Sequence, residues 1–199
     1  MSDLPLQEYR KKSQKALIIE HNRSNSQLIY NVLFELLLSQ GYGNITLQQI
    51  SKLTGISRTT IYRRWSSIDA LIIDAIASRV NDSIVIPTDV EPLESLRIML
   101  ERLALFLQSP LGRSFLQASL SIKDEISLIQ REKLWQERYH LIAQVFQRLL
   151  PAGKKDLPID DIISMTLGSI YFNIFIKNQN ISSDFINLIM KNSVSLLEL

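Results

Sequence analysis

A run of basic and hydroxyl-bearing side chains between residues 57 and 64 points to a definite chemistry. Its members are Ser57, Arg58, Thr59, Thr60, Tyr62, Arg63 and Arg64. An arginine can donate two hydrogen bonds to the edge of a guanine, and a threonine methyl can contact that of a thymine. Arginine and tyrosine can also bind backbone phosphates. On an isolated helix such arginines would equally fit a solvated face, so the elements that position them decide the interpretation.

The sequence around this run predicts two short helices joined by a glycine turn. Thr46 and Gln49 have the spacing of a capping box, which would open the first helix. Ser57 would cap the second helix, which we expect to end near Trp65. Gly55 lies between them, where glycine alone adopts a left-handed backbone at little cost. This is the layout of a helix-turn-helix, whose second helix enters the major groove of DNA.

The stretch from Leu28 to Ala75 is similar to the DNA-binding domain of the tetracycline-repressor (TetR) family. The family pattern is a helix ending in Gly-Tyr, then Thr, Ile-Ala, Ala-Gly-Val-Ser, Gly-Thr-Leu-Tyr, an aromatic residue and Ser-Lys-Glu-Ala-Leu. The corresponding residues here are Gly41-Tyr42, Thr46, Ile50-Ser51, Thr54-Gly55-Ile56-Ser57, Thr59-Thr60-Ile61-Tyr62, Trp65 and Ser67-Ile68-Asp69-Ala70-Leu71. The match covers about a quarter of the chain, and so many spaced agreements make it specific.

The resemblance implies a set of DNA-contacting residues: Thr46, Ser57, Arg58, Thr59, Thr60, Tyr62, Arg63 and Arg64. Of these, Thr46 and Tyr62 would bind backbone phosphates. Residues 57–60 would meet the groove, and the last two arginines would touch base edges or the backbone.

Four positions depart from the family pattern. Thr59 stands where glycine or alanine is usual, so a branched side chain lies at the closest approach to the bases. Ile68 replaces the usual lysine and removes a phosphate contact, which Arg63 and Arg64 could replace. Ser51 and Thr54 replace small apolar residues behind the second helix, and we expect them to loosen its packing slightly.

Apolar residues at helical spacing predict an all-α chain of about nine helices. We predict an N-terminal arm and helix-turn-helix domain over residues 1–68 and a helical regulatory and dimerisation domain over 69–199. The linker at about 83–92 could pass for a short strand, but no second strand is available to pair with it. The other expected helices are 24–40, 67–82, 93–110, 111–121, 124–150, 159–177 and 183–197. Ser24 would cap the first of these, and Pro151-Ala-Gly153 would end the helix 124–150.

The resemblance also implies that the region after the linker binds a ligand and dimerises. Amphipathic candidates for a pocket are Phe106, Phe115, Gln117, Trp135, Tyr139, His140, Tyr171 and Asn173, although each would also fit plain core packing. The segment 159–177 is apolar nearly all round and must be covered on both sides. We therefore expect a homodimer through Ile163, Leu167, Ile170, Ile174, Phe185 and Ile189, the alternative being the central helix of a monomeric core.

Composition narrows the class of protein. The 199 residues are 46% hydrophobic, enough for a sizeable core. Residues 1–70 hold nine Lys and Arg against five Asp and Glu, whereas the remainder holds thirteen against fifteen. A basic N-terminal third fits a nucleic-acid-binding end.

The absence of cysteine excludes disulfides and thiolate metal sites. The polar N-terminus and the lack of a long apolar run predict a cytoplasmic protein outside the membrane.

The sequence offers little material for catalysis. His21 and His140 lie far apart, no metal-ligand spacing occurs, and neither a phosphate-binding loop nor a nucleophile elbow is present. We expect no enzyme activity, no metal and no cofactor.

The sequence favours a dimeric repressor that a small, largely apolar ligand releases from a palindromic DNA operator. Two alternatives stay open. One is a DNA-binding regulator without a small ligand, either controlled by a protein partner or acting as an activator. The other is an interaction scaffold whose helix-turn-helix no longer binds DNA.

Overall fold

The structure is a computed structural model that describes residues 23–151 and 157–198. Helices make up most of this described part, and it contains no strand, so the all-α prediction is confirmed. The predicted basic arm, His21 and residues 152–153 of the predicted helix stop lie outside the described residues.

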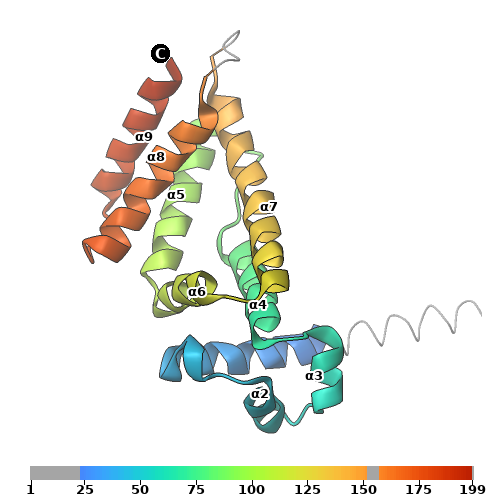
Figure 1. Ribbon diagram of the computed structural model, residues 1–199. Coiled ribbons are helices and arrows are strands. Elements are labelled where there is room, and N and C mark those ends of the chain that lie inside the picture. Colours follow the sequence, from blue (N-terminus) through green and yellow to red (C-terminus); the bar gives the residue numbers. More distant parts are fainter. Residues whose placement is uncertain (1–22, 152–156, 199) are drawn as a thin grey trace, which may run out of the picture. The chain divides into compact units, whose positions relative to one another are not determined.

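Nine α-helices occur in the described part of the chain, as the periodicity predicts. The first helix, residues 23–40, is followed by α2 (Leu47–Thr54), α3 (Arg58–Arg64), α4 (Ile68–Ser83), α5 (Pro92–Gln108), α6 (Pro110–Ser121), α7 (Glu125–Leu149), α8 (Ile159–Tyr171) and α9 (Ser183–Glu198) (Figure 1). Two short elements complete the list: the 3-10 helix η1 (Tyr42–Asn44) and the π-helix η2 (Phe172–Ile176).

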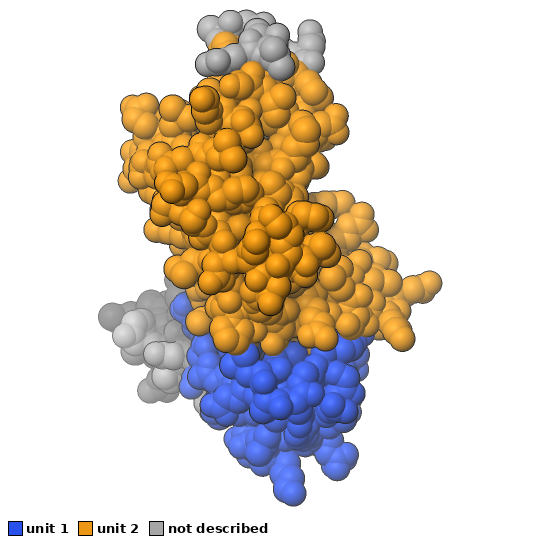
Figure 2. Space-filling model, turned by 90° about the vertical axis from the view of Figure 1, so that its left-hand side faces the viewer, with its two compact units in different colours: residues 1–71 blue, residues 72–199 orange. Residues whose placement is uncertain are grey.

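The chain divides into two compact units, residues 1–71 and residues 72–199 (Figure 2). In the first unit, apolar residues of the first helix, α2 and α3 form one core. Its members, each at most 2% exposed, are Ile29, Leu33, Leu37, Ile50 and Ile61. These residues recur at helical spacing, which explains why three short helices can share one interior.

The two ends of the first helix differ in how well the sequence predicts them. Its end is confirmed, because the helix stops at residue 40 and Gly41 has a φ of 72°. The predicted cap at Ser24 is wrong, because residue 23 is already helical. A hydroxyl followed three residues later by glutamine fits a helix interior as well as a helix start, so the spacing alone misleads.

In the second unit, α5 is the central helix. It packs against α6, α7 and α9, and α8 packs against α7 and α9. The buried residues of α5 recur at helical spacing and include Leu96, Met99, Leu100 and Leu107. This central position explains why α5 contributes to both the core and a cavity described below.

The segment between α4 and α5 is a loop, as predicted, and side chains of neighbouring helices hold it in place. Ser95 donates a hydrogen bond of 2.6 Å to the Pro87 carbonyl, and Arg102 donates one of 2.6 Å to the Val85 carbonyl. Arg138 of α7 donates one of 2.9 Å to the Ile84 carbonyl. Backbone carbonyls outside helices need such partners when they are shielded from water.

Candidate functional site

The helix-turn-helix is built from three local features that the sequence predicts correctly. The Thr46 hydroxyl accepts a hydrogen bond of 3.1 Å from the Gln49 backbone N–H and caps α2. Gly55 ends α2 in the left-handed region, with φ 72° and ψ 0°. The Ser57 hydroxyl accepts one of 3.2 Å from the Thr60 backbone N–H and caps α3. The Ser57 and Thr60 hydroxyl oxygens also lie 2.9 Å apart and share a hydrogen bond.

Ser51 and Thr54 stabilise the turn instead of loosening it. The Ser51 hydroxyl donates a hydrogen bond of 2.7 Å to the Ile56 carbonyl. The Thr54 hydroxyl accepts one of 3.3 Å from the Ile56 backbone N–H. The expectation of loosened packing is therefore wrong, because both hydroxyls bond the backbone just after Gly55, a role that small apolar residues could not perform.

Helix α3 presents one buried and one exposed face. Ile61 is fully buried, whereas Arg58, Thr59, Tyr62 and Arg63 are exposed. Tyr62 is 51% exposed although it is aromatic. Its ring and hydroxyl are therefore accessible from the exposed face of α3.

Arg64 differs from the other two arginines of α3. Its guanidinium donates a hydrogen bond to the Ser26 hydroxyl of the first helix and lies 4.6 Å from the centre of the Trp65 ring. Trp65 in turn packs edge-on against Tyr30, with ring centres 6.1 Å apart. Arg64 is therefore held against its own unit by contacts that the sequence spacing does not predict.

A hollow of about 390 Å³ lies between the first helix and α3. Its walls are Asn25, Ser26, Ile29, Thr60, Arg63, Arg64 and Trp65. Two guanidinium groups in one hollow suit an anion such as a backbone phosphate. Sequence reasoning missed Asn25 and Ser26, because they stand more than thirty residues before α3 in the chain.

The Gly-Tyr pair also has a structural role. The Tyr42 hydroxyl donates a hydrogen bond of 2.6 Å to the Asp69 carboxylate in the first turn of α4. Burial, reinforced by this hydrogen bond and by the charge of Asp69, raises the pKa of Tyr42 to about 12. The tyrosine therefore remains a donor at neutral pH and ties η1 to α4.

The charge on the helix-turn-helix is of one sign. No aspartate or glutamate occurs between Glu35 and Asp69, whereas this interval contains Lys52, Arg58, Arg63 and Arg64. Because Asp69 is 8% exposed, its charge contributes little to the surface. The exposed surface of α2 and α3 is therefore suited to a polyanion.

A family model described as "Bacterial regulatory proteins, tetR family" matches residues 29–75, which contain these caps, the turn and α3. Residues 29–75 therefore form a TetR-type helix-turn-helix, a DNA-binding domain. The resemblance inferred from the motif is confirmed.

Whole-chain comparisons agree with this assignment. The chain is 24% identical over 132 residues to the HTH-type transcriptional regulator AqdR of Rhodococcus erythropolis, a match that covers 65% of this chain and 64% of AqdR. It is 22% identical over 169 residues to the uncharacterized HTH-type transcriptional regulator YdeS of Bacillus subtilis (strain 168), covering 83% and 85%. The crystal structure of the TetR family transcription regulator SCO0332 superposes with a TM-score of 0.65 at 19% identity, covering 86% and 97%.

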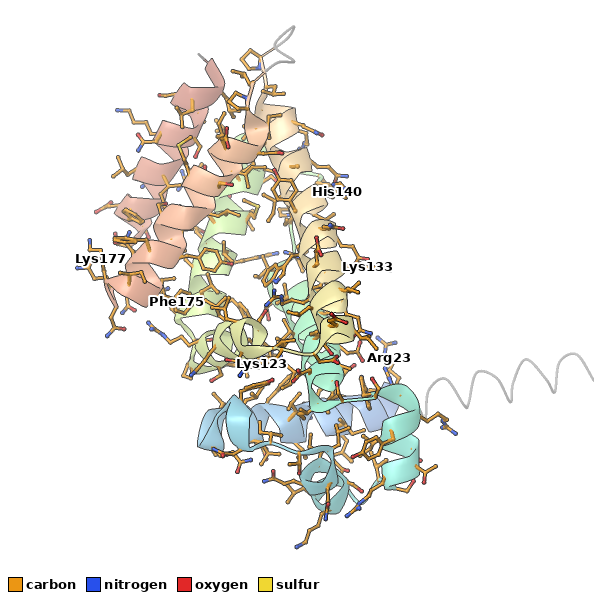
Figure 3. All side chains as sticks on the ribbon, viewed as in Figure 1. Arg23, Lys123, Lys133, His140, Phe175 and Lys177 are labelled. Carbon is orange, nitrogen blue, oxygen red and sulfur yellow. The ribbon has the colours of Figure 1, made fainter. Side chains whose placement is uncertain are left out.

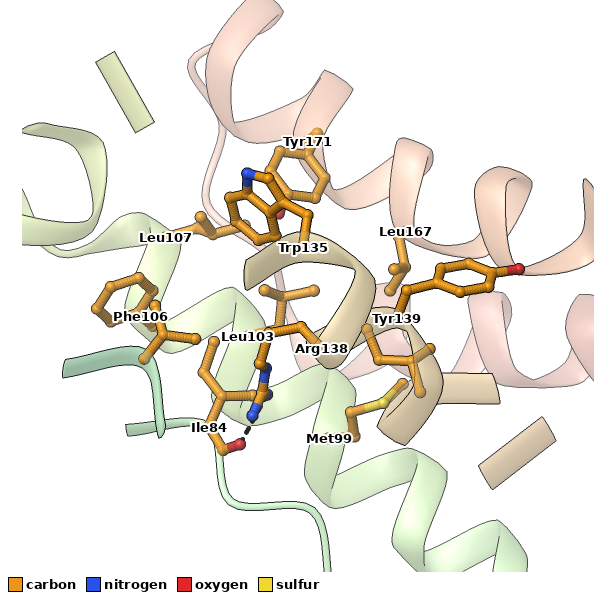
Figure 4. A pocket seen from close by; sticks show the side chains of 12 residues that line it. Ile84, Met99, Leu103, Phe106, Leu107, Trp135, Arg138, Tyr139, Leu167 and Tyr171 are labelled. Atoms are coloured by element: carbon orange, nitrogen blue, oxygen red, sulfur yellow. Dashed lines mark hydrogen bonds between the residues drawn. The ribbon is translucent and has the colours of Figure 1, made fainter. Parts of the chain in front are cut away.

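The second unit of the chain contains an apolar cavity of about 190 Å³ (Figure 4). Four residues predicted to line a pocket do line it: Phe106, Trp135, Tyr139 and Tyr171. Sequence reasoning missed the other eight: Val80, Ile84, Met99, Leu103, Leu107, Arg138, Ile142 and Leu167. Most of these are aliphatic residues of the kind that fill an ordinary core. Only their position in the tertiary structure shows that they line a cavity.

The other four predicted pocket residues lie elsewhere. Phe115 is buried and packs on Phe106, with ring centres 6.1 Å apart. Gln117 and His140 are exposed, and Figure 3 shows His140 on the outer side of α7. The Asn173 amide donates to the Ser169 carbonyl. These four residues therefore do not line this cavity, because residue type alone does not show which face of a helix borders it.

Most of the residues predicted for the dimer interface are buried within the single chain. Ile163, Ile170, Ile174 and Ile189 are at most 5% exposed within the single chain, so they belong to its own core. Phe185 is half-buried, and Leu167 is half-buried in the cavity wall. The periodicity identified the helices correctly but could not distinguish their inner faces from their outer ones.

A different set of apolar residues is exposed on the last two helical segments. Met165 of α8, Phe172 and Ile176 of η2 and Leu188 of α9 are each at least 52% exposed. The stretch Ile159–Ile176 is also long and apolar enough to cross a membrane by length and composition, so the expectation that the sequence lacks such a run is wrong. In the structure, 28% of this stretch is buried. Its outer face therefore requires a cover.

Proposed function

We propose that this regulator is a dimeric repressor that a small, largely apolar ligand releases from a palindromic operator. The observation that carries the proposal is the apolar cavity in residues 72–199, separate in sequence from the helix-turn-helix. In this proposal residues 1–71 read DNA, and residues 72–199 bind the ligand and the partner subunit.

DNA contact is assigned to the exposed side of α3 and to the two helix caps. Arg58, Thr59 and Arg63 would enter the groove, and Tyr62 and Thr46 would bind phosphates. The exposure of these side chains and the absence of acidic residues from the motif support this assignment. Arg64 would act together with Asn25 at the hollow as a phosphate site.

Dimerisation is assigned to the exposed apolar residues of α8, η2 and α9. A partner copy presenting the same surface would cover Met165, Phe172, Ile176 and Leu188 by two-fold symmetry. Two α8–α9 pairs would then form a four-helix packing. In this proposal the apolar surface is covered by protein rather than by lipid, and the protein acts in the cytoplasm, where the DNA is.

The cavity suits a small organic molecule. An apolar cavity of about 150 Å³ is enough to admit benzene, and this one measures about 190 Å³. Val80 of α4 and Ile84, just after it, line the wall, and α4 begins at Ile68, directly after the helix-turn-helix. A ligand that favours one setting of α4 would shift the DNA-binding equilibrium.

The first experiment tests DNA recognition. The full chain would select binding sequences from a random duplex pool at physiological salt, and its mass would be measured by sedimentation. We expect an enriched palindrome with half-sites about one helical turn apart, and a species of twice the chain mass of 22.9 kDa. Absence of enrichment would favour an interaction scaffold.

The second experiment tests release by a ligand. Small molecules that raise the melting temperature of the protein would be assayed for loss of binding to the selected duplex. Leu103→Trp fills the cavity, and Leu105→Trp on the exposed side of the same helix is the matched control. We expect only Leu103→Trp to abolish the response. A response that survives in Leu103→Trp would contradict the assigned pocket.

A further inference from the structure

Arg138 of α7 is an unusual residue in the cavity wall. It is 7% exposed, and it carries the one charged side chain among the twelve residues that line the cavity (Figure 4). The other eleven are aliphatic or aromatic residues and methionine. Large apolar cavities do not need a cation for packing, so the placement of this charge calls for a reason.

The guanidinium of Arg138 has one neutral partner. Its Nη2 donates a hydrogen bond of 2.9 Å to the Ile84 carbonyl. A guanidinium has five N–H donors, and no carboxylate within the described residues forms an ion pair with this one. Burial lowers the pKa of Arg138, because the charged form loses hydration.

A second donor lies in the same wall. The Tyr171 ring stands at the end of α8, next to the π-helix, and its hydroxyl remains protonated because burial raises its pKa. Tyr139, by contrast, donates its hydroxyl to the Asp160 carboxylate. The cavity therefore combines an apolar body with a buried cation and a neutral O–H donor, which is the lining that an amphipathic anion requires.

We propose that the ligand of this cavity is a small carboxylic acid with an apolar body, whose carboxylate pairs with Arg138. The inference rests on the proposed ligand-binding function and specifies its chemical class. A carboxylate matches the planar fork of a guanidinium and can accept two parallel hydrogen bonds from it. The apolar body would lie against Leu103, Phe106 and Trp135.

The same contact couples the cavity to α4. The Ile84 N–H donates to the Val80 carbonyl at 2.8 Å, so Ile84 continues the last turn of α4. A ligand carboxylate would bind donors of the same guanidinium that holds the Ile84 carbonyl, so binding of the anion would shift Arg138 and, with it, this end of α4. Recognition of the anion would then be linked to the position of the helix end.

The test compares matched acids and neutral analogues. Hexanoate, octanoate, benzoate and phenylacetate would be titrated calorimetrically against the full-length protein, each beside its primary amide. We expect at least one acid to bind about tenfold to hundredfold more tightly than its amide. In Arg138→Gln, which keeps a donor for the Ile84 carbonyl, this preference should disappear.

Arg148→Gln is the matched control, because Arg148 lies on the same helix and donates to the Val90 carbonyl outside the cavity. It should retain the preference for the acid. Failure of all four acids to bind at millimolar concentration, equal binding of acids and amides, or a preference that survives in Arg138→Gln would each overturn the inference. Acids that bind through Arg138 without changing DNA affinity would leave the inference intact and contradict the proposed repressor function.

Discussion

The three arginines of α3 have different surroundings. Arg58 and Arg63 are on its exposed side, whereas Arg64 is engaged by Ser26 and by the Trp65 ring. A guanidinium that already has a partner must give it up or share it before it can contact DNA. We therefore expect Arg58 and Arg63 to account for most of the direct DNA contacts of the arginines.

The double variant Arg58→Ala, Arg63→Ala tests this expectation. It should weaken binding to the selected duplex by about tenfold or more, and its affinity should depend less steeply on salt, because each lost phosphate contact lowers the slope by about one. Fluorescence anisotropy at several salt concentrations provides the measurement. Arg97→Ala, an exposed arginine on α5, is the control. Unchanged affinity in the double variant would show that α3 does not read DNA.

Tyr42 provides a prediction for stability. Removing its hydrogen bond to Asp69 in Tyr42→Phe should lower the free energy of unfolding by about 1 kcal/mol at neutral pH. The folded pKa of about 12 lies above the ordinary value of 10, so the contribution is complete below pH 10 and is lost as pH rises towards 12. Chemical denaturation of both proteins at pH 7 and pH 11 measures the difference, which should shrink at pH 11.

The control is Tyr62→Phe, because Tyr62 is half-exposed and extends from α3. It should leave stability unchanged at both pH values while affecting DNA binding. Equal stability of Tyr42→Phe and the unaltered protein would mean that η1 is not tied to α4 through this contact.

At the scale of elements, the turn between α2 and α3 concentrates several backbone constraints in a few residues. Gly55 has a positive φ, and Ser51 and Thr54 bond the backbone of Ile56 just beyond it. The geometry of α3 depends on this turn, because a recognition helix has to be presented at a defined angle to the helix before it.

Gly55→Ala should destabilise the turn by about 1–2 kcal/mol, the cost of a left-handed conformation for a residue with a Cβ atom. No atom lies within 4 Å of the added Cβ, so the effect comes from the backbone alone. Gly43→Ala is the matched control. A Cβ atom added at Gly43 likewise has no atom within 4 Å, but the backbone of Gly43 does not have a positive φ. Denaturation midpoints decide the prediction, and equal midpoints for the two variants would contradict it.

The end of α8 is a second element with a departure from regular geometry. The backbone continues from Tyr171 into the π-helix η2, where the Lys177 N–H donates to the Phe172 carbonyl at 3.1 Å. Short π-helical turns occur frequently at functional sites. Here the turn begins directly after a residue of the cavity wall and carries two of the exposed apolar side chains proposed for the dimer.

At the scale of the whole molecule, the proposed dimer gives a distinct prediction. Leu188→Glu would place a charge on the exposed apolar surface of α9 and should convert the dimer to a monomer, because an unpaired charge is costly to bury. Leu120→Glu changes a leucine on α6 that is even more exposed, and it should leave the dimer unchanged. Sedimentation velocity measures both. A dimer that persists in Leu188→Glu would exclude α9 from the interface.

Loss of the dimer should also weaken operator binding, because a monomer occupies one half-site without the second contact. The effect should be seen on the palindrome and not on a single half-site. This difference separates an interface defect from a defect in the helix-turn-helix.

The sequence by itself determined the helix-turn-helix and the all-α fold. The features that identify this motif are local. Thr46 and Ser57 each accept a hydrogen bond from the residue three positions later in the chain. Gly55 adopts its left-handed conformation without a distant partner. Helix periodicity is local in the same sense. Such features depend on spacing along the chain, which the sequence displays directly.

The tertiary structure decided which faces of the helices are inside and which side chains meet. Arg64 reaches Ser26 across 38 positions, and Arg138 reaches the Ile84 carbonyl across 54. Ile163 and Met165 stand two residues apart on one apolar helix, yet the first is buried and the second exposed. These outcomes depend on how several helices pack together, and long-range packing leaves no fixed spacing in a single sequence.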